Sequence, residues 1–309
     1  MQRHRKLVFV LGFVLVAATI ASAVAYHLIR RPAKAVLLLP DGNLLVYVNF
    51  MPMHFADMGP MPFASNPQYQ DFLAQTGFHF ETDLDSLVIS ASSPAETSED
   101  VTGILTGKFD QDRLIAYLQK QPVETESYGG KTIFALREGT QTFRVCILDS
   151  KTIALANGEA PESMHGIIDR ATGAASSHWL LDNYYGDVPT GSVAWAIARV
   201  PGGQDVTPVA AGPMNLGFLR DSVTVVSLRY TGSLRFRAEF ISSTKNGADQ
   251  VFHAINGALE LGRAGQGARN MDKDVAAVIE GTQLQQSGNR VVLSIVVPQD
   301  VVTRMSKRR

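Results

Sequence analysis

The sequence predicts an α+β protein: an N-terminal transmembrane helix followed by two related units, each an antiparallel sheet with helices. Three observations predict this class. Residues 7–28 are mostly apolar and contain no Asp, Glu, Lys or Arg, the chain after them alternates short β-patterned runs with turn signals, and the order strand, helix, hairpin occurs twice. We expect the following division: a basic cytoplasmic tail 1–6, a transmembrane helix (signal anchor) 7–28, a juxtamembrane linker 29–42, a first α+β unit 43–173, a linker 174–191 and a second α+β unit 192–309.

The apolar run 7–28 is long enough to cross a bilayer. As a helix its 22 residues would reach about 33 Å, against a hydrocarbon core of about 30 Å. The basic flank 3–6 favours a cytoplasmic N-terminus. We therefore expect a single-pass protein of the inner (cytoplasmic) membrane that contacts the lipid bilayer through this helix. Cleavage is the alternative, because 21–23 and 23–25 have the small-x-small form of a signal peptidase site. Both interpretations place the ectodomain, 35–309, in the periplasm.

The charge balance limits the partners of the ectodomain. Six of the 28 Lys and Arg residues precede residue 35 and none of the 29 Asp and Glu residues does, so the ectodomain carries a formal charge of about −7. That sign argues against nucleic acid as a partner. Cys146 is the single cysteine, so no internal disulfide is possible. Its strand-like surroundings, 143–148, predict a thiol packed in a core.

Capping residues and turn residues predict most of the helices and strands of the first unit. Asn66 is an expected N-cap before Pro67, and Gly77 is the expected end of that helix. Asp110 is the expected N-cap of a second helix, which Pro122 stops. The other expected elements are strands at 44–48, 87–89 and 104–109, hairpins turning at 128–131 and 149–150, and a helix opened by Pro161.

The second unit is expected to repeat this order. Strands at 223–230 and 234–240 pair across 231–233, and the second alternates apolar with charged residues, which is typical of a half-buried antiparallel strand. Its charged face carries Arg235, Arg237 and Glu239. The remaining elements are a strand at 193–200, a helix at 248–261, a strand at 291–297 and a short helix at 298–305.

Five short motifs of the first unit stand out: Asn66-Pro67-Gln68-Tyr69 followed by Phe72, Thr76-Gly77-Phe78, Asp83-Leu84-Asp85, Gly107-Lys108-Phe109-Asp110 and Tyr128-Gly129-Gly130. In these motifs the chain resembles a group of bacterial membrane-anchored envelope proteins of uncharacterised function. The resemblance covers residues 40–170 and extends to the second half in outline. It implies a similar duplicated core behind an N-terminal span, and it brings no activity and no catalytic residue with it.

The segment 51–63 is the strongest candidate for a binding site, because methionine, histidine and phenylalanine residues are concentrated in it. Thioether and imidazole groups suit Cu(I), whereas methionine also suits an adaptable apolar binding surface or ordinary packing. The candidate metal ligands are Met51, Met53, His54, Met58 and Met61. The candidate partner-contact residues are Met51, Met53, Phe55, Met58, Met61 and Phe63.

No known catalytic motif occurs in the sequence with neighbouring residues that would support its function. The histidines form no His-x-x-x-His pair, and no Gly-x-Ser-x-Gly or Ser-x-x-Lys motif stands where a nucleophile would be activated. We therefore expect a non-enzymatic envelope protein without a cofactor that binds a protein, a peptide or an apolar ligand. The alternatives are copper handling through 51–61 and a hydrolase whose catalytic groups come from distant positions.

Overall fold

The computed structural model describes residues 32–52, 65–92, 100–138, 141–158, 160–174, 177–200, 210–211, 214–215, 219, 221–266 and 273–307. The chain divides into two compact units, Met1–Ala33 and Lys34–Arg309, and every element described below lies in the second. The predicted span 7–28 lies outside the described residues. Among those that are described, no helix combines the length and the apolar character needed to cross a membrane.

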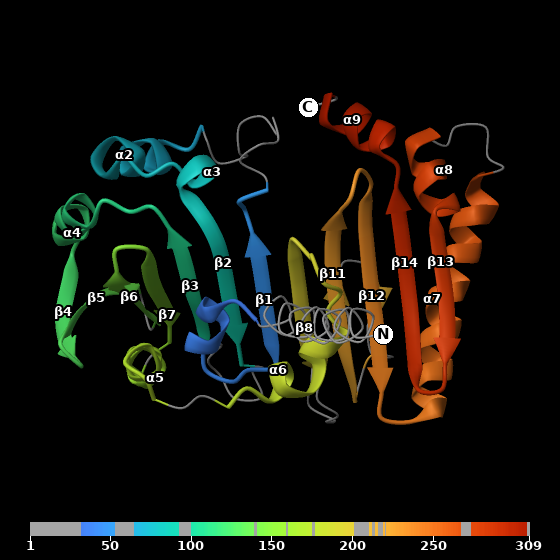
Figure 1. The fold of residues 1–309 in the computed structure, drawn as a ribbon, viewed down its shortest axis with the longest axis horizontal. Coiled ribbons are helices and arrows are strands. Elements are labelled where there is room, and N and C mark those ends of the chain that lie inside the picture. The colour runs from blue at the N-terminus through green and yellow to red at the C-terminus, as the bar shows by residue number, and fades with distance from the viewer. Residues whose placement is uncertain are drawn as a thin grey trace, which may run out of the picture. The chain divides into compact units, whose positions relative to one another are not determined.

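A large antiparallel sheet forms the centre of the unit Lys34–Arg309 (Figure 1). Its strands are β1 (Leu44–Asn49), β2 (Leu84–Ala91), β3 (Val101–Gly107), β4 (Val123–Tyr128), β5 (Lys131–Glu138), β6 (Gln141–Asp149), β7 (Thr152–Asn157), β8 (Ala194–Val200), β11 (Ser222–Tyr230), β12 (Leu234–Ser242), β13 (Thr282–Ser287) and β14 (Arg290–Val297). Their order across the sheet is β13-β14-β12-β11-β8-β1-β2-β3-β7-β6-β5-β4. A separate small ladder pairs β9 (Ala210–Ala211) with β10 (Met214–Asn215). The α+β class predicted from the sequence is confirmed.

The helices begin and end largely where local signals predict. The Asn66 side chain accepts a hydrogen bond from the backbone of Gln68, and the Asp110 side chain accepts one from Arg113. Gly77 ends its helix with φ +70°, a conformation that favours glycine. The described helices are η1 (Lys34–Leu38, 3₁₀), α2 (Pro67–Thr76), α3 (Phe80–Asp83), α4 (Gln111–Gln119), α5 (Glu162–Ala171), α6 (Trp179–Tyr184), η3 (Tyr185–Asp187, 3₁₀), α7 (Lys245–Gln266), α8 (Lys273–Glu280) and α9 (Gln299–Lys307).

The two halves of the chain meet in the middle of one continuous sheet, where β1 pairs antiparallel with β8. Outward from this pair the order is β1-β2-β3-β7-β6 in the first half and β8-β11-β12-β14-β13 in the second. In each half a helix, α4 or α7, follows the third strand of this series, and the β4–β5 hairpin extends the first half alone. The halves are therefore joined through backbone hydrogen bonds, not through a flexible linker between separate sheets.

Helices cover both faces of the first half of the sheet. On one face, Leu114 and Leu118 of α4 pack against Phe134, Val145 and Ile153. On the opposite face, reached by alternate residues of the same strands, side chains such as Cys146 are also fully buried, and α5 packs there on β6 and β7. The burial of Cys146 predicted from the sequence is confirmed.

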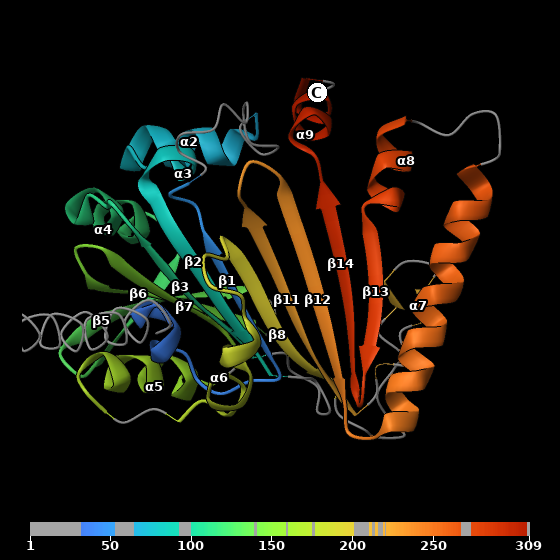
Figure 2. The same ribbon diagram turned by 45° about the vertical axis from the view of Figure 1, so that its right-hand side comes forward.

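In the second half α7 lies along β12, β13 and β14 (Figure 2). Its residues Ala248 and Val251 are fully buried against Val291 of β14. The helix is longer at both ends than the predicted 248–261, and α8 was not predicted.

Both expected linkers contain described residues that pack in the fold. Within the segment 29–42, the described residues include η1, where Val36 and Leu39 are fully buried. Within 174–191, α6 buries Leu180 and Leu181. Basic, Pro- and Gly-containing composition is typical of linkers, but each segment also holds a short apolar run that packs in the core.

Candidate apolar ligand-binding site

A cavity of about 250 Å³ lies under the helices of the first half. It is enclosed by α2, α3 and α4 on one side and by β3, β6 and β7 on the other. The lining residues are Phe72, Thr76, Phe78, Phe80, Leu105, Phe109, Asp110, Leu114, Tyr117, Leu118, Phe143, Val145, Ile153 and Leu155. Asp110 is the only one of these fourteen residues that carries a charge, so the cavity is apolar.

Aromatic rings line the side of the cavity that faces the helices. The ring of Phe78 lies 5.0 Å from that of Phe80 and 5.0 Å from that of Phe109, measured between centroids. Phe72 of α2 meets Tyr117 of α4 edge to face at 5.3 Å. Contacts of this kind contribute about 0.5–1.5 kcal/mol each beyond the burial of their area. The rings therefore hold α2, α3 and α4 together around the space.

Two polar side chains at the cavity, those of Thr76 and Asp110, are hydrogen-bonded within the chain. Thr76 donates its hydroxyl hydrogen to the carbonyl of Phe72 at 2.7 Å. Asp110 is the N-cap of α4 and pairs with Arg113 at 3.3 Å. Lys120 donates to the side-chain oxygen of Gln75 at 3.0 Å, which joins α4 to α2 at the surface. A ligand in the cavity would therefore meet hydrocarbon and ring surfaces, with polar contacts at the edge.

The cavity is partly open to solvent, since Asp110 and Phe143 of its lining are exposed. Phe143 lines it and is nevertheless 40 % exposed. An apolar cavity of about 150 Å³ in another protein stays dry and binds benzene, so a space of this size can hold an apolar group. It is slightly below the range of about 300–1,000 Å³ that is common for drug-sized ligands. The site can bind an apolar molecule or part of one, and its lining holds no acid–base pair for catalysis.

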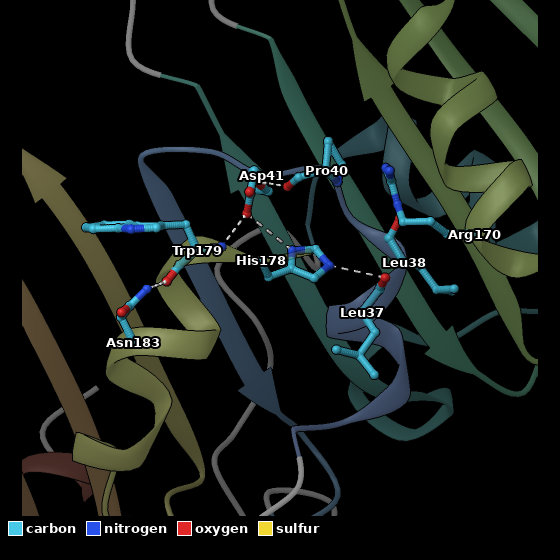
Figure 3. A network of polar contacts seen from close by, with 9 residues as sticks. Leu37, Leu38, Pro40, Asp41, Arg170, His178, Trp179 and Asn183 are labelled. Carbon is cyan, nitrogen blue, oxygen red and sulfur yellow. Dashed lines mark hydrogen bonds and ion pairs between the residues drawn. The ribbon is translucent and has the colours of Figure 1, made fainter. Parts of the chain in front are cut away.

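Apart from the cavity, a polar cluster surrounds the buried side chain of His178 (Figure 3). Its Nε2 lies 3.2 Å from the carbonyl oxygen of Leu37, and its Nδ1 lies 3.6 Å from a carboxylate oxygen of Asp41. The same oxygen of Asp41 accepts a hydrogen bond from the backbone of Trp179 at 3.0 Å. Because a carbonyl can only accept, Nε2 carries the hydrogen of the bond to Leu37. Both ring nitrogens thus contact the chain itself, and the cluster joins η1 to α6.

Arg170 of α5 completes the attachment of η1. Its Nε donates to the carbonyl of Leu38 at 2.8 Å. Burial lowers the pKa of this guanidinium from its ordinary value, and the nearby carboxylates of Asp169 and Asp41 oppose that effect. Since the contacts of Arg170 and His178 span more than 130 positions of the chain, no local sequence signal could have indicated them.

Of the predicted site residues, Met51 lies within the described part of the chain. Met51 is exposed, and its backbone nitrogen donates to the side chain of Asn49 at 3.0 Å. Met53, His54, Phe55, Met58, Met61 and Phe63 lie outside the described residues, so the metal and partner hypotheses for 51–63 stay predictions. In the part of the chain that the structure describes, no three His, Cys, Asp or Glu side chains are grouped so that they could hold a metal ion.

The cavity was missed in the sequence, although a signal for it exists. Four aromatic residues fall within 69–80, and the structure brings three of them, Phe72, Phe78 and Phe80, to the lining. The strand residues that complete the cavity come from positions up to Leu155, which the sequence alone does not place nearby.

Comparison with known proteins finds similar solved structures and no match in sequence. No protein-family model matches the chain, and no curated protein matches its sequence significantly. Crystal form III of TP0453 is similar to 90 % of this chain and 99 % of its own, with 8 % identity and a TM-score of 0.49. Crystal form IV of TP0453 is similar to 89 % of this chain and 96 % of its own, with 10 % identity and a TM-score of 0.48.

Proposed function

We propose that the chain is a non-enzymatic, membrane-anchored envelope protein that binds an apolar ligand in the cavity beneath α2, α3 and α4. The sequence of 7–28 supports the anchor and an extracytoplasmic position of the residues that follow it. The cavity supports the choice of an apolar ligand over a peptide or a protein partner, because aromatic and aliphatic side chains make up most of its lining.

The proposed class of ligand depends on one observation, the apolar cavity of about 250 Å³ whose lining includes the exposed Phe143. Filling it removes apolar surface of both the ligand and the lining from water, at about 25 cal/mol for each Å². The opening leaves room for the polar end of an amphiphile to remain in solvent. A single acyl chain or a small aromatic compound fits these requirements.

The ligand hypothesis is tested by crosslinking. The full chain, reconstituted in lipid nanodiscs, is incubated with a fatty acid that carries a photoactivatable group on its acyl chain, and the crosslinked peptides are identified by mass spectrometry. We expect labelling of peptides that contain lining residues of α2, α4 and β3. Labelling confined to 7–28 would exclude the cavity as the binding site.

A matched pair of variants controls for nonspecific labelling. Leu105 and Leu87 lie opposite each other on β3 and β2, on the same face of the sheet, but only Leu105 lines the cavity. Leu105→Phe fills part of the space and should reduce labelling. Leu87→Phe adds the same volume beside it and should leave labelling unchanged.

The anchor is tested separately by topology. A reporter enzyme that is active only in the periplasm, fused after Arg309, should be active. Activity of a cytoplasmic reporter at the same position would instead show that the ectodomain is not exported.

We also propose that the two halves of the sheet descend from one duplicated unit. The shared outward order of five strands, with α4 and α7 at the same place in the connections, supports this. Superposition of the two halves in an experimental structure, with strands matched in this order, tests it.

A further inference from the structure

Two large apolar side chains are exposed on neighbouring parts of the fold. Leu37 of η1 is 40 % exposed and Trp179 of α6 is 42 % exposed. They lie on either side of His178, which contacts the carbonyl of Leu37 and directly precedes Trp179 in the chain (Figure 3). We call the surface formed by η1 and α6 around these two residues the η1–α6 surface.

Packing beneath the η1–α6 surface keeps both side chains in place. Two neighbours of Leu37 in the sequence, Val36 and Leu39, are fully buried in the core. The guanidinium of Arg199 lies over the ring of Trp179, 4.9 Å from its centroid, and the ring of Tyr184 meets it at 5.4 Å. Exposure of Trp179 is therefore a property of a fixed arrangement.

The chain length before η1 restricts what this surface can meet. The predicted span ends at residue 28 and η1 begins at Lys34. Six steps of a fully extended chain, at about 3.3–3.6 Å each, cover only about 20 Å. If 7–28 crosses the bilayer, η1 must lie within that distance of the membrane surface.

We propose that the η1–α6 surface rests on the bilayer, with Leu37 and Trp179 in the interfacial region of the lipid. This inference depends on the proposed anchor. Tryptophan is enriched at membrane interfaces because its ring is apolar and its N–H can meet water or headgroups. Exposed charges of both signs lie on the same elements and beside Trp179: Lys34 is in η1, Asp182 is in α6, and Arg199 and Asp41 contact Trp179. Both signs fit the phosphate and the amine of a zwitterionic headgroup.

Tryptophan fluorescence provides a direct test. The chain has two tryptophans, and neither lies in 7–28, so the anchor contributes no signal. Trp195 is 5 % exposed within the sheet and stacks on Tyr47. The full chain is reconstituted in phosphatidylcholine vesicles with or without bromine atoms on the upper part of the acyl chains, since bromine quenches only tryptophan that it contacts.

We expect brominated lipid to quench part of the wild-type fluorescence, and we expect Trp179→Phe to lose that quenchable part. Leu37→Gln, which weakens the apolar contact, should reduce the quenching. Flotation with the vesicles shows whether the anchor has inserted. Inserted protein whose Trp179 is not quenched overturns the inference and leaves the anchor intact. Protein that does not float with the vesicles contradicts the anchor, and the inference with it.

Discussion

The Nε2 atom of His178 lies 3.2 Å from the carbonyl oxygen of Leu37, a residue 141 positions earlier in the chain. This contact attaches η1, the first described helix, to α6, which precedes the second half of the sheet. His178 is buried, so loss of the imidazole would remove this hydrogen bond and the packing of the ring between η1 and α6.

His178→Ala should therefore lower the free energy of unfolding by about 1–3 kcal/mol, because it removes one hydrogen bond and a buried ring. Urea unfolding of the full chain in mild detergent, followed by tryptophan fluorescence, measures this. His253→Ala, at an exposed position of α7, is the control and should change stability by less than about 0.5 kcal/mol. Equal effects of the two substitutions would show that the contact does not stabilise the fold.

Cys146 should be unreactive in the folded protein. Burial raises the pKa of its thiol to about 11, against which the charge of Lys131 has a smaller, opposite effect. Almost no thiolate is then present at pH 8, and the sulfur is covered by the core. Iodoacetamide should label the chain in urea and leave it unlabelled in native conditions, as intact mass shows. Rapid labelling of native protein would contradict the burial.

Packing around the cavity should depend on Leu118. This residue of α4 is buried in the core cluster and also lines the cavity. Leu118→Ala should cost about 2–5 kcal/mol, because it removes buried hydrocarbon and enlarges an existing space. Leu261→Ala is the matched control, since Leu261 is 77 % exposed and its loss should cost less than about 0.5 kcal/mol. Urea unfolding of both variants decides between these outcomes.

Acid should weaken the attachment of α7 to the edge of the sheet. Gln286 of β13 donates to Asp249 at 2.6 Å, and Lys245 pairs with it at 3.3 Å; in this order they lower the pKa of the Asp249 carboxyl from its ordinary value. A lowered folded-state pKa contributes stability above the unfolded-state value of about 3.9. That contribution is lost as pH falls through the lower, folded-state pKa.

Asp249→Asn should therefore reduce the loss of stability between pH 5 and pH 2. Urea midpoints measured across this range for the variant and the wild type give the difference. Asp112→Asn, on the exposed side of α4, is the control for simply removing one carboxylate. A variant with the same pH profile as the wild type would mean that Asp249 has no differential role in folding.

Short-range features of this fold were predictable. The caps at Asn66 and Asp110, the αL turn at Gly77 and the burial of Cys146 each depend on the residue type and a few neighbours. The same holds for the hairpins, whose turns are encoded within four residues. The α+β class follows from these elements.

The charged face of β12 shows where the alternation of apolar and charged residues did not predict burial correctly. Alternation predicts that Arg237 and Glu239 face solvent, yet Glu239 is only 4 % exposed. It pairs with Arg237 at 2.7 Å and with Arg290 at 2.8 Å, and Arg290 also pairs with Asp187 of η3. These charges meet because β12, β14 and η3 lie side by side, and their mutual pairing makes the burial of Glu239 tolerable.

Sequence alone thus established an apolar N-terminal segment, the net negative charge of the rest of the chain, and many of the positions where helices and strands begin and end. Such features arise from residue composition and from neighbouring residues. Tertiary structure decided that β1 and β8 join the halves into a single sheet, that distant aromatic and aliphatic side chains enclose a cavity, and that η1 is held by His178 and Arg170. Contacts between positions far apart depend on how every element packs at once, and no short window of the chain records them.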